Sequence, residues 1–218
     1  MKQQAVALFD LDFTLLAADS EELWCKYLFE LQKVDSNFIA GVEDFHRQYK
    51  EGKLDLCQYQ EFLFAPLAQY PAAEILRLRE NYLGQIRNVA RADVLQRVQW
   101  HRSEKHILVL ITATNNFLAE PIAHLLGFPN LICTQLESHQ GRFTGKVSGV
   151  PAFQHGKVIR LVAWLREKKL SLNRSWFYSD SHNDLPLLNL VDYPVMVTPD
   201  SVLQDYGLQR GWRTFDLY

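Results

Sequence analysis

The chain has 218 residues, enough for one large domain or for one domain with an inserted subdomain. Hydrophobic residues make up 48% of the chain and charged residues 22%, as in an ordinary globular protein. The formal net charge is only −2, and Lys and Arg are interspersed with Asp and Glu, which argues against a nucleic-acid partner.

The cysteines and the hydropathy pattern bear on the compartment. Cys25, Cys57 and Cys133 are far apart and odd in number, so they fit neither a disulfide framework nor a zinc site. No apolar run approaches the length that spans a membrane, and the chain enters its first strand without a signal-peptide core. We expect a cytoplasmic protein with no membrane partner, and the sequence leaves its oligomeric state open.

The first predicted strand leads into two carboxylates. Residues 5–9 form a short apolar run that suits a buried strand of a parallel sheet. Asp10 and Asp12 follow, and residues two apart face the same side wherever the chain stays extended. Two carboxylates so near each other repel, and a bound cation or a shared proton must offset the repulsion. Such an arrangement is typical of active sites. From this segment alone, two solvated loop residues remain an alternative.

A helical block is predicted next. Asp19 and Ser20 followed by two glutamates resemble a helix start, and apolar residues then recur at helical spacing. Further helices are expected over residues 38–49, 55–68 and 72–88. The block contains no convincing strand, so we expect an all-helical cap over residues 17–89, inserted into a core made of residues 1–16 and 90–218.

Strands and helices alternate in the rest of the chain. The expected elements are a helix at 91–103, a strand at 106–111, a helix at 117–126, a strand at 131–133, a hairpin around 139–141, a helix at 155–168, a strand at 175–179, a helix from 184, a strand at 194–197 and an edge at 213–215. This alternation predicts an α/β fold with a Rossmann-like parallel sheet and helices on both faces. Ligands bind such sheets at the carboxyl ends of the strands.

Four short motifs occur in order, each at a predicted strand end or helix start. They are Asp10-x-Asp12-x-Thr14, Thr112 after an apolar strand, Lys157 in a helix start, and Asp180-x-x-Asn183-Asp184 after a further strand. Together they resemble the four ordered motifs of the haloacid dehalogenase-like superfamily of phosphohydrolases. The last motif is similar to the phosphoserine phosphatase-like branch, some of whose members are described as histidinol-phosphatases. The resemblance covers nearly the whole chain, including the cap.

The resemblance implies a magnesium-dependent phosphatase that acts on a small phosphomonoester. In this scheme Asp10 forms an aspartyl-phosphate, and Asp12 protonates the leaving alcohol and then takes a proton from water. Two unit charges about 4 Å apart cost on the order of 4 kcal/mol at a surface-like dielectric, so a cation must accompany the anionic ester. By resemblance, Asp10 and Asp180 give carboxylate oxygens to Mg²⁺, and Asp12 gives its backbone carbonyl.

Further roles follow from the same resemblance. Lys157 and Thr112 contact the phosphoryl group, and Asp184 orients Lys157 or a metal-bound water. The expected residues around the substrate and its phosphate are Thr14, Asp19, Arg47, Thr112, Ala113, Lys157 and Asn183. Among them, Asp19 is suited to a substrate ammonium and Arg47 to a substrate carboxylate. Without the family, Lys157 would be taken as a solvated charge, Thr112 as a strand end and Asp184 as a helix cap.

The sequence also departs from the family pattern. Phe13 stands where Gly or Ser is frequent, Ser179 replaces a Gly, and the residues around Arg47 do not reproduce the pattern of phosphoserine phosphatases. The candidate substrates are therefore histidinol phosphate, phosphoserine and other amino-alcohol or sugar phosphates. A phosphotransferase or mutase on the same fold is one alternative function. A non-catalytic phosphate-binding or interaction module is another, and the retention of all four motifs counts against it.

Overall fold

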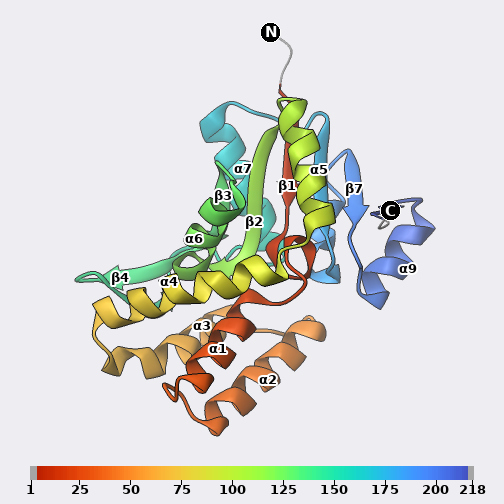
Figure 1. The fold of residues 1–218 in the computed structure, drawn as a ribbon. Coiled ribbons are helices and arrows are strands. Elements are labelled where there is room, and N and C mark those ends of the chain that lie inside the picture. Colours follow the sequence, from red (N-terminus) through yellow and green to blue (C-terminus); the bar gives the residue numbers. More distant parts are fainter. Residues whose placement is uncertain (1–3, 216–218) are drawn as a thin grey trace.

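The computed structural model describes residues 4–215, so the outermost residues of the expected core, 1–3 and 216–218, lie outside it. Its centre is a six-stranded sheet in which every neighbouring pair is parallel, in the order β3-β2-β1-β6-β7-β8 (Figure 1). The strands are β1 (Val6–Phe9), β2 (Ile107–Asn115), β3 (Leu131–Thr134), β6 (Ser175–Ser179), β7 (Tyr193–Met196) and β8 (Arg213–Thr214). The predicted fold class is confirmed.

Helices cover both faces of this sheet. They are α5 (Ala92–Ser103), α6 (Asn116–Leu126), α7 (His155–Lys168), α8 (Leu185–Leu188) and α9 (Ser201–Gln209). Along β1, Ala7 and Phe9 belong to the apolar cluster that includes α5 and α6, whereas Val6 and Leu8 belong to the cluster that includes α7, α8 and α9. Successive residues of a strand point to opposite faces, so a strand buried on both faces is apolar throughout, as the run at residues 5–9 indicated.

A helical block lies below the sheet in Figure 1, between β1 and α5 in the chain. It consists of α1 (Ser20–Glu30), α2 (Ser36–Lys50), α3 (Leu56–Phe64), the 3₁₀ helix η2 (Ala65–Gln69) and α4 (Ala72–Val89). The chain enters and leaves the block side by side, because Leu16 and Ala90 form an isolated antiparallel bridge. The side chains of Asp19, Asp35 and Asp55 accept backbone N–H groups at the starts of α1, α2 and α3, which fixes where these helices begin.

The predicted hairpin consists of β4 (Leu136–His139) paired with β5 (Arg142–Val147), and it packs against the helical block. At Gly145 a Cβ atom would lie 2.8 Å from the Cβ of Phe64 and 3.1 Å from the carbonyl oxygen of Gln60, both in α3. The backbone there also has a φ of +83°, which favours glycine. Gly145 therefore lets the hairpin approach α3 closely.

Some elements differ from the sequence-based expectation. Strand β2 continues to Asn115, past the apolar run that ends at Ile111, and helix α9 was not predicted. The edge strand ends at Thr214, one residue earlier than expected. Within residues 4–215, no helix combines the length and apolar composition needed to cross a bilayer.

Candidate active site

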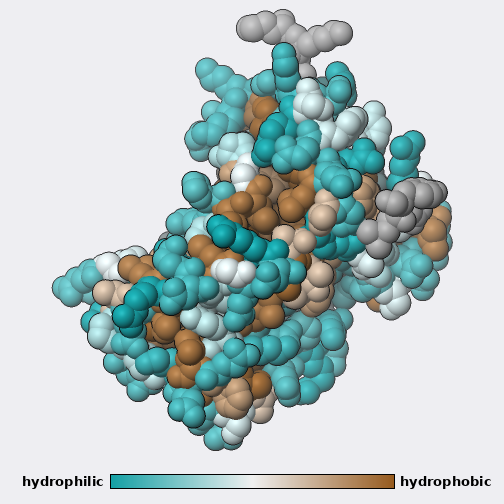
Figure 2. Space-filling view, in the orientation of Figure 1, coloured by the Kyte–Doolittle hydropathy of each residue, from teal (hydrophilic) through white to brown (hydrophobic). Residues whose placement is uncertain are grey.

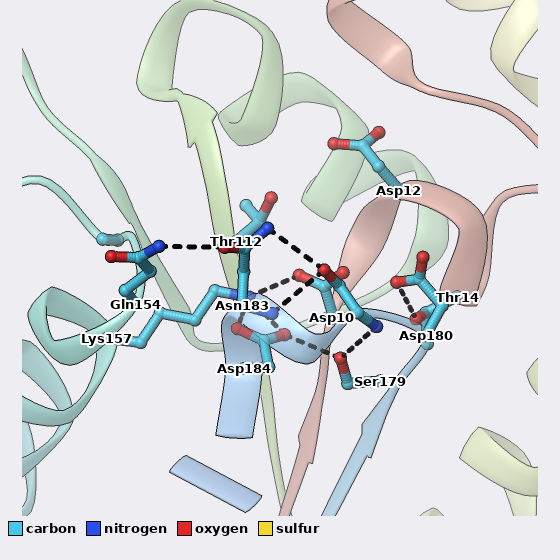
Figure 3. Close-up of polar contacts among 12 residues, drawn as sticks. Asp10, Asp12, Thr14, Thr112, Gln154, Lys157, Ser179, Asp180, Asn183 and Asp184 are labelled. Carbon is cyan, nitrogen blue, oxygen red and sulfur yellow. Dashed lines mark hydrogen bonds and ion pairs between the residues drawn. The ribbon is translucent and has the colours of Figure 1, made fainter. Parts of the chain in front are cut away.

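The extended backbone of β1 ends at the first motif. Residues Leu11–Leu15 form a π-type turn, η1, in which Phe13 has a φ of +55°. A non-glycine residue in this left-handed region is uncommon, and such strain clusters at functional sites. In Figure 3 the Asp12 carboxylate lies apart from the cluster around Asp10, although both residues line one cavity. Both keep extended backbone angles, with φ and ψ of −72° and 163° at Asp10 and of −71° and 135° at Asp12.

A buried cluster joins Asp10, Lys157 and Asp184. The Lys157 ammonium, in the first turn of α7, donates to Asp10 Oδ1 at 2.7 Å and to Asp184 Oδ2 at 2.8 Å (Figure 3). Asp184 ends the 3₁₀ helix η3 (His182–Asp184) and also accepts a hydrogen bond from Ser179 Oγ at 2.7 Å. Burial alone would lower the pKa of Lys157, but attraction to the two carboxylates outweighs it and raises that pKa. Lys157 is therefore a permanent cation.

Asp180 lies beside Asp10 because their strands are neighbours. Phe9 of β1 pairs with Tyr178 of β6, and the N–H of Asp10 donates to the Tyr178 carbonyl at 3.0 Å. Thr14 Oγ1 donates to Asp180 Oδ1 at 3.2 Å and is fully buried, so it orients this carboxylate rather than lining the cavity above. Burial, followed by repulsion from Asp10, raises the pKa of Asp180. Two carboxylates of distant motifs thus converge.

The charge balance at this point fits a divalent cation. Asp10 and Asp184 pair with one cation, Lys157, while Asp180 lies beside Asp10 without a cation partner among the described residues, and burial raises the pKa of Asp10 to about 7. Within the described part of the chain, no three His, Cys, Asp or Glu side chains form a metal-binding group. Mg²⁺ needs no such group, since it is typically held by one or two carboxylates together with waters and substrate oxygens. The oxygen-only donors and the excess negative charge suit Mg²⁺.

The Asp12 carboxylate is held on the side of the helical block. It accepts the N–H of Ser20 at 2.7 Å and Thr114 Oγ1 at 2.6 Å, and Thr112 Oγ1 donates to Thr114 Oγ1 at 3.0 Å. Burial, followed by repulsion from Asp19, raises the pKa of Asp12 to about 7. A carboxyl group with a pKa near neutrality can both give and take a proton.

A cavity of about 50 Å³ separates the strand ends from the helical block. Its lining comprises Asp10, Asp12, Phe13, Asp19, Glu21, Phe45, His46, Tyr49, Leu54, Leu56, Tyr59, Thr112, Ala113, Thr114, Phe153, Lys157 and Asp184. The Phe13 ring meets His46 of α2 edge-on, with 6.4 Å between the ring centres. Such a volume holds a few water molecules, so the cavity in this state is too small for a phosphomonoester.

Besides Thr14, two further expected substrate residues do not line this cavity. Arg47 lies on the exposed side of α2, where its guanidinium pairs with Asp44. Asn183 is buried, and it accepts from Gln154 Nε2 at 2.9 Å and donates to the Tyr49 carbonyl at 3.1 Å. Arg47 therefore does not face the cavity in this structure, and Asn183 ties α2 to the sheet domain.

Among the lining residues outside the expected set, Thr114 and Glu21 make the hydrogen bonds that matter most for the site. Thr114 holds Asp12, and Glu21 is buried with three hydrogen bonds to one of its oxygens. A signal for Thr114 exists in the sequence, because Thr112 and Thr114 are two residues apart on a strand and face the same side. Glu21 has no such signal, since a glutamate in the first turn of a helix is usually explained by the helix dipole.

Helix α7 lies close to the loop that precedes it, and this close approach places Lys157 in the site. A substitution at Gly156 tests the approach. A Cβ atom there would lie 1.9 Å from the Pro151 carbonyl oxygen. We expect Gly156→Ala to lower the free energy of unfolding by about 1–3 kcal/mol, as overpacking does. The matched control is Gly84→Ala in α4, where nothing lies within 4 Å of the added methyl group. The Gly84→Ala substitution should raise the free energy of unfolding by about 0.5–1 kcal/mol. Urea denaturation measures the change in both variants. Equal effects of the two substitutions would contradict the close approach of α7 to Pro151.

The fold and the site together define an α/β protein of the Rossmann-like class with a carboxylate centre under a helical insertion. A model of the haloacid dehalogenase-like hydrolases matches residues 7–189. The chain belongs to this family and is a phosphatase of it, as the four motifs predicted.

Individual relatives agree with this assignment. The chain is 39% identical to a histidinol-phosphatase of Neisseria meningitidis over 95% of this chain and 96% of the relative. It is 31% identical to a phosphoserine phosphatase of Mycobacterium tuberculosis over 97% of this chain and 70% of the relative. A crystal structure of a protein of unknown function from Bordetella pertussis Tohama I covers both chains completely, with a TM-score of 0.89 and 35% identity. A phosphoserine phosphatase with a phospho-aspartyl intermediate analogue shares the fold, with a TM-score of 0.71, 16% identity and coverage of 94% and 91%.

Proposed function

We propose that the protein is a magnesium-dependent phosphatase that hydrolyses a small phosphomonoester through an aspartyl-phosphate on Asp10. The observation that carries this proposal is the buried contact of Asp10 with Lys157, beside Asp180 at the neighbouring strand end. The names of the relatives support an amino-alcohol or amino-acid phosphate as the substrate, with histidinol phosphate and phosphoserine as the first candidates. A sugar phosphate remains part of the proposed substrate class without support from these names.

The first chemical step forms one P–O bond and breaks another. An Asp10 oxygen attacks phosphorus in line, and the bond between phosphorus and the leaving oxygen breaks while Asp12 gives that oxygen its proton. Lys157 and the Thr112 hydroxyl offset negative charge on the phosphoryl oxygens. Asp10, Asp180 and the Asp12 carbonyl would hold Mg²⁺, which would supply the remaining positive charge against the ester.

The second step returns the enzyme to its starting state. Asp12, now ionised, takes a proton from a water molecule that attacks the same phosphorus and releases Asp10. The contacts of Asp12 with Ser20 and Thr114 hold its carboxylate on the leaving-group side for both proton transfers. Release of inorganic phosphate distinguishes this reaction from that of a phosphotransferase or mutase, which would deliver the phosphoryl group to an acceptor.

We also propose that residues 17–89 act as a cap domain over a core of residues 1–16 and 90–218. The paired entry and exit at Leu16 and Ala90 support this division, since one short bridge joins both connections. The small cavity supports a closed state in which the cap excludes water during catalysis and opens for exchange.

Metal dependence tests the proposed function directly. We expect the purified protein to release phosphate from p-nitrophenyl phosphate with Mg²⁺ and to stop when EDTA removes the metal. Mg²⁺ at a hundredfold excess over its dissociation constant should also stabilise the fold by about 2.7 kcal/mol. Asp180→Asn should lose both effects, whereas Asp205→Asn, at an exposed position of α9, should keep them. Turnover that persists in EDTA would contradict the proposal.

A further inference from the structure

The cavity is acidic on the side that faces the cap. Asp19 and Glu21 line it from the start of α1, opposite Lys157. Lys157 is the one Lys or Arg in the lining, and its charge is already paired with the carboxylates of Asp10 and Asp184. Burial lowers the pKa of His46, so this residue adds no positive charge near neutral pH. A leaving group in this part of the site meets carboxylates and no free cation.

Glu21 is held in a way that leaves one oxygen free. Its Oε1 accepts from Gln60 Nε2 at 2.9 Å, from the Asn115 backbone N–H at 3.2 Å and from Asn115 Nδ2 at 2.5 Å. Asn115 Nδ2 also donates to Gln60 Oε1 at 2.9 Å, which locks the two amides together. The second oxygen, Oε2, accepts no hydrogen bond from any residue that the structure describes, although Glu21 is only 6% exposed.

Oε2 can accept a hydrogen bond from a ligand in the cavity, because Glu21 is part of the cavity lining. Burial, followed by repulsion from Asp19, raises the pKa of Glu21 to about 8, and a cation beside it would favour the ionised form again. Aromatic rings complete the lining on this side, with Phe45 and Tyr59 packed 5.2 Å apart between ring centres. Aromatic faces also attract cations.

We propose that Glu21 is a specificity-determining residue that selects phosphomonoesters whose leaving alcohol carries a protonated nitrogen and no carboxylate. This inference rests on the proposed phosphatase function and narrows its substrate class. A substrate carboxylate would lie against Asp19 and Glu21, and Arg47, the cap arginine that could have offset it, pairs with Asp44 outside the cavity. A substrate ammonium would instead donate to Glu21 Oε2.

The test compares matched substrates on matched variants. The substrates are 3-aminopropyl phosphate, its neutral isostere butyl phosphate, phosphoserine and p-nitrophenyl phosphate. The variant is Glu21→Gln, whose amide oxygen retains the three hydrogen bonds while its NH₂ group replaces the free oxygen. The control is Glu22→Gln in the same helical turn, because Glu22 pairs with Lys26 at 2.6 Å and does not line the cavity.

We expect the wild type to prefer 3-aminopropyl phosphate over butyl phosphate by at least about tenfold in kcat/KM. Glu21→Gln should remove about tenfold of this preference, whereas Glu22→Gln should leave both the preference and kcat for p-nitrophenyl phosphate within about twofold of the wild type. Equal kcat/KM for the amine and its isostere in the wild type would overturn the proposal, as would a preference for phosphoserine or an unchanged ratio in Glu21→Gln. If Glu21→Gln does not fold, the wild-type ratio alone decides. Failure of the wild type to turn over any of the four esters would instead refute the phosphatase function itself.

Discussion

An Asp10→Asn variant is expected to lose phosphatase activity by about 10⁴- to 10⁶-fold in kcat, the range seen when a catalytic nucleophile is removed. The amide cannot form an aspartyl-phosphate, and it offers a metal one neutral oxygen in place of a charged pair. Phosphate release under single-turnover conditions measures the loss. Because Asn has nearly the shape of Asp, the substitution changes the charge and little else.

The stability of this variant provides its control. Burial raises the pKa of Asp10 to about 7, which means that the fold disfavours its charged form in the absence of metal. Asp10→Asn should therefore unfold at the same or a higher temperature than the metal-free wild type, while Lys157 keeps its contact with Asp184. Activity within a factor of about ten of the wild type would exclude Asp10 as the nucleophile.

Lys157→Met is expected to cost both catalysis and stability. It leaves Asp10 and Asp184 buried side by side without their shared cation, and breaking a buried ion pair from one side typically costs about 3–5 kcal/mol. Turnover should fall by at least about 10²-fold, as when one stabilising donor of a transition state is lost. Urea denaturation and steady-state kinetics measure the two losses.

A matched control lies on the same helix. Lys168 pairs with Glu167 on the surface, with 46% of its side chain exposed, so Lys168→Met should change the free energy of unfolding by less than about 0.5 kcal/mol. Adding Asp184→Asn to Lys157→Met should recover part of the lost stability, because it removes one of the two unpaired carboxylates. If the double variant is no more stable than Lys157→Met, mutual repulsion of these carboxylates is not the cause.

The sheet and the meeting of Asp10 with Asp180 were predictable for a general reason. Continuous apolar runs mark strands buried on both faces, and alternation with helices makes such strands parallel. Parallel strands bring their carboxyl ends to one edge, so polar residues that follow β1 and β6 converge there although 170 positions separate them in the chain.

The details of the site depended on contacts that no local pattern carries. Phe13, which follows Asp12, has a positive φ that is not expected for a bulky residue. The partners of Glu21 come from α3 and from the end of β2, so its role emerges only when the cap packs on the sheet. Arg47 has a charge that suits a substrate carboxylate, but its position on α2 directs its side chain outward, toward Asp44. The helical pattern of the sequence alone does not determine this orientation.

The most direct measurement locates the phosphoryl group on the enzyme. p-Nitrophenyl phosphate has a good leaving group that needs little protonation, so Asp12→Asn should still form the aspartyl-phosphate but hydrolyse it slowly. After an acid quench in the presence of Mg²⁺, peptide mass spectrometry of this variant should find one phosphate on Asp10, and the double variant Asp10→Asn with Asp12→Asn should carry none. Phosphate on another residue, or its absence from Asp10 while turnover continues, would contradict the mechanism.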